Sequence, residues 1–70
     1  MYAMPVMLVL ADQDWNSVQH RAVAEVLLIG NPRITTRDEL RHWGKAINDL
    51  TEREVSTITM DKARKLGIPH

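Results

Sequence analysis

Histidines and carboxylates are the side chains of this sequence that could carry acid–base chemistry. His42 lies one helical turn after Asp38 and Glu39, close enough on a helix for a carboxylate to orient the imidazole of a general base. No serine or cysteine nucleophile is placed by a recognisable motif, and no glycine-rich phosphate loop is present. We therefore expect no enzymatic activity and interpret His42 as a solvated side chain among charged neighbours.

Metal-binding patterns are also missing from the sequence. The histidines His20, His42 and His70 are far apart and lack the close spacing that zinc sites use. There is no cysteine for a thiolate site or a disulfide. Asp12 and Asp14 could form a carboxylate pair for a cation, but carboxylates before a helix are more often caps. We expect neither a metal nor another cofactor.

A row of cations indicates binding instead of catalysis. Arg37, Arg41 and Lys45 recur every four residues, which places them along one side of a helix. Trp43 lies among them in the sequence, and tryptophan and arginine are frequent at binding hot spots. These four residues form the predicted partner-binding surface. The alternatives are a solvated charged face and a tryptophan that belongs to the core.

The helix that would carry this row is predicted from Thr36 to Leu50. Thr36 and Glu39 form a capping-box pair, in which each side chain bonds the backbone amide of the other residue. Apolar residues then recur at the helical period, at Leu40, Trp43, Ile47 and Leu50. This amphipathic helix needs a partner that buries its apolar stripe.

A second helix is predicted from about Trp15 to Ile29, with Asp12 or Asp14 as its cap. Its apolar stripe would contain Trp15, Val18, Ala22, Val26 and Ile29. The second half is apolar except for Glu25, so we expect it to be covered nearly all round. Gly30, Asn31 and Pro32 would end the helix, since glycine and asparagine suit a left-handed cap and proline cannot continue it.

The apolar run from Pro5 to Ala11 is short enough to favour a strand over a helix. Both of its faces are apolar, so the strand should be buried on both sides. A strand needs a neighbour for its backbone, and the candidates are the short segment from Arg33 to Thr35 and the same strand of a second chain. The alternative is an extended N-terminal arm that packs on the helices.

The C-terminal part contains a second capping box, Thr51 with Glu54, which predicts a break after Leu50. The alternative is one continuous helix from Thr36 to Leu66. If the break is present, Thr59 can start a further helix through Leu66, which Gly67 would stop.

Size and charge limit the class of protein. The 70 residues, predicted as a single domain over 1–70, bury too little surface for a robust lone core, so we expect a homodimer. A net charge of zero argues against a generic polyanion binder. The apolar opening is too short for a membrane span, so we expect a cytoplasmic protein without membrane contact. The expected core and dimer residues are Val6, Leu8, Leu10, Trp15, Val18, Val26, Leu40, Ile47 and Leu50.

The segment TRDELRHWGKAINDL, after a strand-like run and a helix, resembles the second helix of ribbon-helix-helix proteins. The resemblance covers about residues 5 to 50. It implies an intertwined dimer in which paired strands place polar side chains in the DNA major groove. The corresponding run here has only apolar side chains, so the residues that would read DNA bases are missing.

The expected fold is therefore mainly α, with a short N-terminal strand or arm followed by two or three helices in an intertwined homodimer. The expected function is that of a small non-enzymatic regulator that binds and inhibits or modulates a host or cognate protein, similar in size to regulators from phages and mobile elements. The alternative is a ribbon-helix-helix transcriptional regulator or antitoxin that contacts DNA through Arg37, Arg41 or Lys45.

Overall fold

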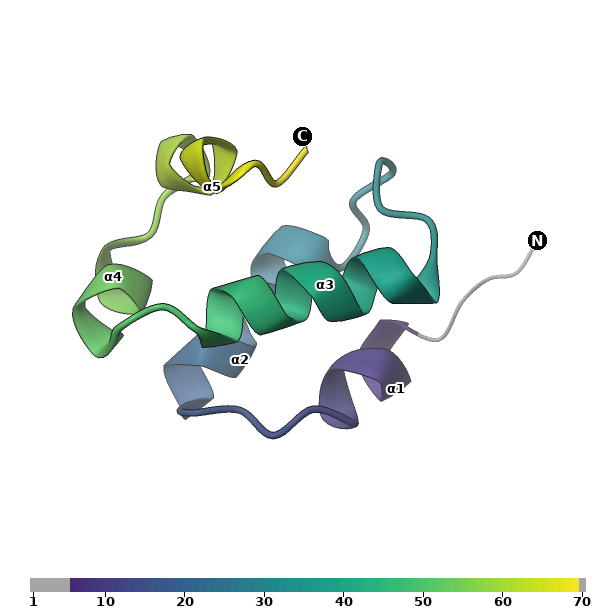
Figure 1. Ribbon diagram of the computed structural model, residues 1–70, viewed down its shortest axis with the longest axis horizontal. Helices are drawn as coiled ribbons and strands as arrows, with labels where there is room; N and C mark the ends of the chain where they lie inside the picture. Colours follow the sequence, from purple (N-terminus) through teal and green to yellow (C-terminus); the bar gives the residue numbers. More distant parts are fainter. Residues whose placement is uncertain (1–5, 70) are drawn as a thin grey trace.

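The described part of the chain, residues 6–69 of a computed structural model, contains five helices and no strand (Figure 1). The helices are α1 (Val6–Ala11), α2 (Val18–Leu28), α3 (Arg37–Asn48), α4 (Glu52–Thr57) and α5 (Met60–Leu66). In Figure 1, α3 runs through the middle of the molecule, and it packs against both α1 and α2. The prediction of a mainly helical chain is confirmed.

Both predicted capping boxes are present. The backbone N–H of Glu39 donates to Thr36 Oγ1 at 3.1 Å, and the N–H of Thr36 donates to Glu39 Oε1 at 3.2 Å. At the start of α4, the N–H of Glu54 donates to Thr51 Oγ1 at 3.1 Å, and that of Thr51 donates to Glu54 Oε1 at 2.9 Å. These bonds satisfy backbone groups that a helix start leaves unpaired. The break between α3 and α4 is therefore confirmed, and one helix through Leu66 is excluded.

The last helix also begins and ends as its sequence predicts. Thr59 caps α5 by accepting from the N–H of Lys62 at 3.3 Å. Gly67 follows with a φ of 96°, a left-handed conformation that glycine adopts without steric cost. Its N–H donates to the Arg64 carbonyl at 2.9 Å and closes the helix.

The start of α2 differs from the prediction. Ser17 is the cap, because its hydroxyl accepts from the N–H of His20 at 3.1 Å, and neither Asp12 nor Asp14 has this role. Asn48, at the end of α3, holds the preceding loop by accepting from the N–H of Asn16 at 2.8 Å and donating to the Asp14 carbonyl at 3.0 Å. These tertiary hydrogen bonds hold Asp14 and Asn16 in the loop, and the helix begins only at Val18.

The N-terminal run is a helix, so the predicted strand or extended arm is wrong for Val6–Ala11. Pro5 and His70 lie outside the described residues. Val9 and Leu10 are buried and Val6 is half-buried, a spacing of three and four that matches one face of a helix. The predicted burial on both sides is also wrong, since Met7 and Leu8 are 49% and 68% exposed. No strand in the described residues is available for pairing, whereas a helix satisfies its own backbone against α3.

The buried face of α2 is not the predicted one. His20, Ala24, Leu27 and Leu28 are buried, whereas Val18 and Val26 are 87% and 78% exposed and Ile29 is 41% exposed. The expected placement of Val18 and Val26 in the core, and the expected all-round cover of this helix, are therefore wrong for the single chain. The helix is apolar on two faces, and the face containing His20 is the one that packs on α3.

The core lies between α1, α2, α3 and the C-terminal residues. Leu10, Leu28, Leu40 and Ile47 are among its most buried side chains. Val6, Trp15, Trp43 and Leu50 are partly buried against it. Leu8, also expected in the core, is exposed because it lies on the outer side of α1.

Gly44 lies where the N-terminal segment packs closely against α3. A Cβ there would lie 3.1 Å from Gln13 Oε1, 3.5 Å from a Trp15 ring carbon and 3.8 Å from a Leu10 methyl carbon. Gln13 Nε2 also donates to the Gly44 carbonyl at 3.2 Å. The close approach that a glycine permits is therefore made by this chain's own residues.

Replacing Gly44 by leucine should lower the free energy of unfolding by about 1–3 kcal/mol, because the new side chain must displace Trp15 and Leu10. Alanine should change it far less, since a helix propensity gain of about 1 kcal/mol opposes a small shift of Gln13. Urea unfolding followed by circular dichroism measures both. The exposed neighbour provides the control, Lys45→Leu, and equal stability of the Gly44 and Lys45 variants would contradict the packing of α1 on α3.

Candidate functional site

The predicted cationic row lies on the side of α3 that faces α1. Arg37, Arg41 and Lys45 are all exposed, and within residues 6–69 their side chains make no hydrogen bond or ion pair. Arg41 and Lys45 line a groove of about 440 Å³ together with residues of the segment that follows α1. Arg37 and Arg41 line an adjoining groove of about 310 Å³. The three cations therefore border one continuous surface between α1 and α3, which we call the α1/α3 surface.

Carboxylates share this surface with the cations. Asp12, Asp14 and Asp49 line the larger groove, and Asp12 also lines the smaller one. The two ion pairs of the described region are elsewhere, between Arg21 and Glu25 and between Arg64 and Asp61. The α1/α3 surface is thus mixed in charge, and its cations are available to carboxylates of another molecule.

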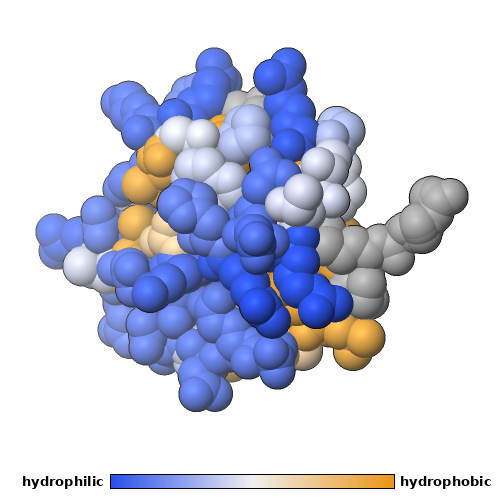
Figure 2. Space-filling model, turned by 45° about the vertical axis from the view of Figure 1, so that its right-hand side comes forward, coloured by the Kyte–Doolittle hydropathy of each residue, from blue (hydrophilic) through white to orange (hydrophobic). Residues whose placement is uncertain are grey.

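Apolar side chains of α1 lie at the edge of the same surface. Leu8 lines the smaller groove beside Arg37 and Arg41, and Met7 is half exposed next to it in the sequence. Figure 2 shows a largely hydrophilic face with a hydrophobic group at its lower right, the side on which α1 lies in Figure 1. An exposed leucine beside two unpaired arginines combines apolar contact with charge recognition.

The sequence contained a signal from which the exposure of Leu8 could have been predicted. Val6, Val9 and Leu10 have helical spacing, which would have placed Leu8 on the outer face of a helix.

Trp43, the fourth predicted binding residue, lies elsewhere. It is half-buried against the core, and its ring is close enough to Gly67 that a Cβ there would lie 3.4 Å from it. The ring of His42 meets it edge-on, with centroids 4.7 Å apart and planes at 75°. The structure therefore brings together Arg37, Arg41 and Lys45, and it separates Trp43 from them.

Glu39, one of the two carboxylates near His42, has a structural role as part of the capping box. The backbone N–H of Thr35, with the hydroxyl of Thr36, lowers the pKa of Glu39 from its ordinary value. The backbone N–H of Thr51 similarly lowers the pKa of Glu54. His42 is exposed and bonded to neither Asp38 nor Glu39. The geometry that would orient its imidazole as a base is not formed.

Between residues 6 and 69, no three side chains of histidine, aspartate or glutamate lie together as a cation site would require. Nor does any helix in that range combine the length and the apolar character needed to cross a bilayer.

Comparison of the chain with protein-family models, with curated proteins and with solved structures gives no significant match. The strand pairing implied by the ribbon-helix-helix resemblance has no counterpart in α1.

Proposed function

We propose that this chain is a small regulatory protein without catalytic activity that acts by binding another protein through the α1/α3 surface. The observation that carries the proposal is the position of Leu8, which is 68% exposed beside the unpaired cations Arg37 and Arg41. A single exposed apolar residue is ordinary on a protein surface. Here the exposed Met7 adds to the apolar area at Leu8, and a flexible methionine side chain adapts to the shape of a partner. The arrangement fits a segment that presents an apolar side chain flanked by carboxylates.

The test uses a library of displayed helical peptides, screened against the folded chain. We expect selected peptides to carry an apolar residue within one turn of aspartate or glutamate. Leu8→Ser and Arg41→Ala should each weaken their binding about tenfold, which corresponds to about 1.4 kcal/mol. Fluorescence anisotropy of a labelled peptide measures the dissociation constants.

The matched control is Arg64→Ala, because Arg64 is an exposed arginine on α5 whose partner is Asp61. Its variant should bind as the unmodified chain does. Selection of peptides without carboxylates, or equal loss in the Arg64 and Arg41 variants, would remove the α1/α3 surface as the binding site.

DNA binding is the second candidate, and the observation in its favour is that Arg37, Arg41 and Lys45 have no side-chain partner among residues 6–69. Three cations neutralise at most about three phosphates, whereas about six to ten contacts are needed for a loss of a thousandfold or more between 50 and 200 mM salt. The carboxylates of Asp12 and Asp14, which line the same groove, would also repel the phosphate backbone of DNA. Tight, strongly salt-dependent binding of duplex DNA would favour this second candidate over the first.

A further inference from the structure

The outer face of α2 is the most exposed apolar feature of the described chain. Val18, Ala22 and Val26 follow one another at intervals of four residues, and all three are exposed. We call them the α2 ridge. Ile29, at the end of the helix, is also 41% exposed. This is the face that the sequence assigns to the core, and among residues 6–69 nothing covers it.

Grooves lie on both sides of the α2 ridge. On one side, a groove of about 310 Å³ is lined by Val23, Leu27 and the linker residues Ile58 and Thr59, among others. On the other side, a groove of about 670 Å³ is lined by Trp15, Ser17 and the Arg21–Glu25 pair, among others. A ridge between two grooves is the surface shape that lets one helix pack across another.

We propose that the α2 ridge binds the α2 ridge of a second copy of this chain, with the two helices antiparallel about a two-fold axis at Ala22. A two-fold contact requires a surface that complements itself. The residue pattern of the ridge is symmetric about its centre, with a valine four residues before and four residues after the central alanine. Val18 of one copy therefore meets Val26 of the other, and the small side chain of Ala22 lets the two backbones approach at the crossing.

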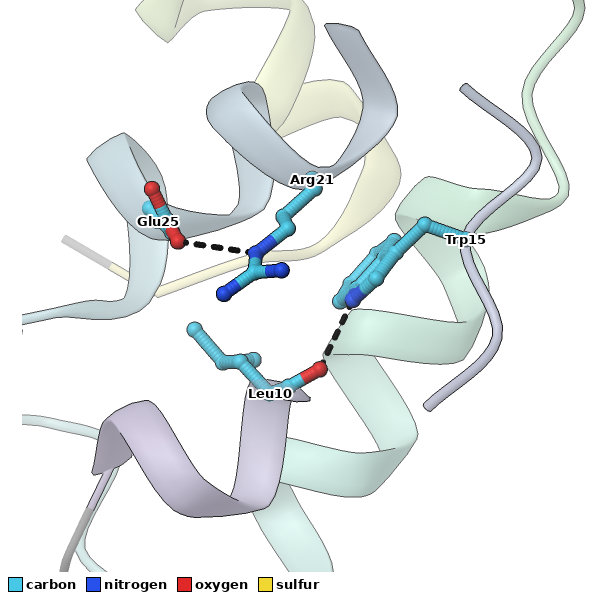
Figure 3. A network of polar contacts seen from close by, with 4 residues as sticks. All are labelled: Leu10, Trp15, Arg21 and Glu25. Atoms are coloured by element: carbon cyan, nitrogen blue, oxygen red, sulfur yellow. Dashed lines mark hydrogen bonds and ion pairs between the residues drawn. The ribbon is translucent and has the colours of Figure 1, made fainter. Parts of the chain in front are cut away.

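The charges beside the ridge fit the same arrangement. Arg21 and Glu25 lie on one flank of the ridge and are joined at 3.1 Å, with side chains 46% and 30% exposed. Figure 3 shows them on the side of α2 that faces Trp15 and Leu10, where the Trp15 indole N–H donates to the Leu10 carbonyl at 2.7 Å. A two-fold axis at Ala22 reverses the order of the pair in the second copy, so each arginine approaches the other copy's glutamate. Exposed pairs add little affinity, but they select this orientation.

Dimerisation through the α2 ridge is not needed for the chain to fold. The chain exposes 4675 Å², close to the roughly 4,450 Å² expected for a folded protein of 8.0 kDa. One copy is therefore already as compact as a folded monomer. A ridge of three small side chains buries less than a standard interface of about 800 Å² per partner, so the dimer should be weak and reversible.

Sedimentation equilibrium at chain concentrations from about 10 μM to about 1 mM tests the proposed dimer. The average mass of the unmodified chain should rise from that of one chain toward twice that mass. Ala22→Arg and Val26→Lys should remain at 8.0 kDa throughout, with unchanged circular dichroism because both sites are exposed. Leu8→Lys is the control: it changes the α1/α3 surface and should associate as the unmodified chain does.

Charge reversal tests the orientation of the two copies. Glu25→Arg should weaken association by placing like charges on the shared flank, and adding Arg21→Glu should restore it. A chain that stays monomeric over the whole range would overturn the proposal, and so would association that Ala22→Arg leaves unchanged. Loss of association in the Leu8→Lys variant would also overturn it, by moving the contact to the α1/α3 surface. Peptide binding there is measured separately, so either proposal can fail alone.

Discussion

Replacing Leu28 by alanine is expected to lower the free energy of unfolding by about 2–5 kcal/mol, whereas Val26→Ala, two residues earlier, should change it by less than about 0.5 kcal/mol. Leu28 is 1% exposed in the core, and Val26 is 78% exposed on the α2 ridge. The first substitution leaves a cavity in the core. The second removes two methyl groups that are already in water.

Urea unfolding at about 10 μM, where a weak dimer is dissociated, measures both variants under the same conditions. The comparison is internally matched, because both positions lie within α2 and both substitutions introduce the best helix former. If the two variants lost the same stability, α2 would be buried on the face that its sequence first suggests. The packing described for α2 and α3 would then be wrong.

The second large effect is expected at His20. Its side chain is 1% exposed, and both ring nitrogens are bonded, Nδ1 to Ser17 Oγ at 2.6 Å and Nε2 to the Leu50 carbonyl at 2.8 Å. A carbonyl only accepts, so Nε2 carries the proton and Nδ1 accepts from the serine hydroxyl. The imidazole therefore joins the start of α2 to the junction between α3 and α4.

His20→Ala should lower the free energy of unfolding by about 2–4 kcal/mol, because it creates a cavity and leaves the Leu50 carbonyl without its donor. His20→Gln should cost less, since the glutamine amide can still donate to that carbonyl. Urea unfolding gives both values. Equal losses for the alanine and glutamine variants would show that an amide donor at this position recovers no stability, and this would contradict a stabilising hydrogen bond to the Leu50 carbonyl.

The Ser17→Ala variant separates the stability contribution of the helix cap from that of the His20 ring. It removes the hydroxyl that bonds Nδ1 and caps α2, but it leaves the Nε2 bond to Leu50 in place. We expect a loss of about 1 kcal/mol, typical of an N-cap. A loss as large as that of His20→Ala would place the whole effect at the helix start.

Local signals in the sequence determined the C-terminal half of the fold, from α3 to α5. The hydroxyls of Thr36, Thr51 and Thr59 and the glycine at Gly67 act on backbone groups within a few residues, so their effects can be read from spacing alone. The cationic row on α3 follows from the same helical period. Its placement on one side of a helix was predictable before its surroundings were known.

Only the tertiary structure decided the N-terminal part and the two faces of α2. Val6–Ala11 and α2 are apolar on more than one side, so periodicity alone does not choose between strand and helix or between opposite faces. The choice depends on contacts with residues far away in the chain. Leu10 packs over Gly44, and His20 reaches Leu50. These contacts leave Leu8 and the α2 ridge exposed, and both proposed binding surfaces follow from that exposure.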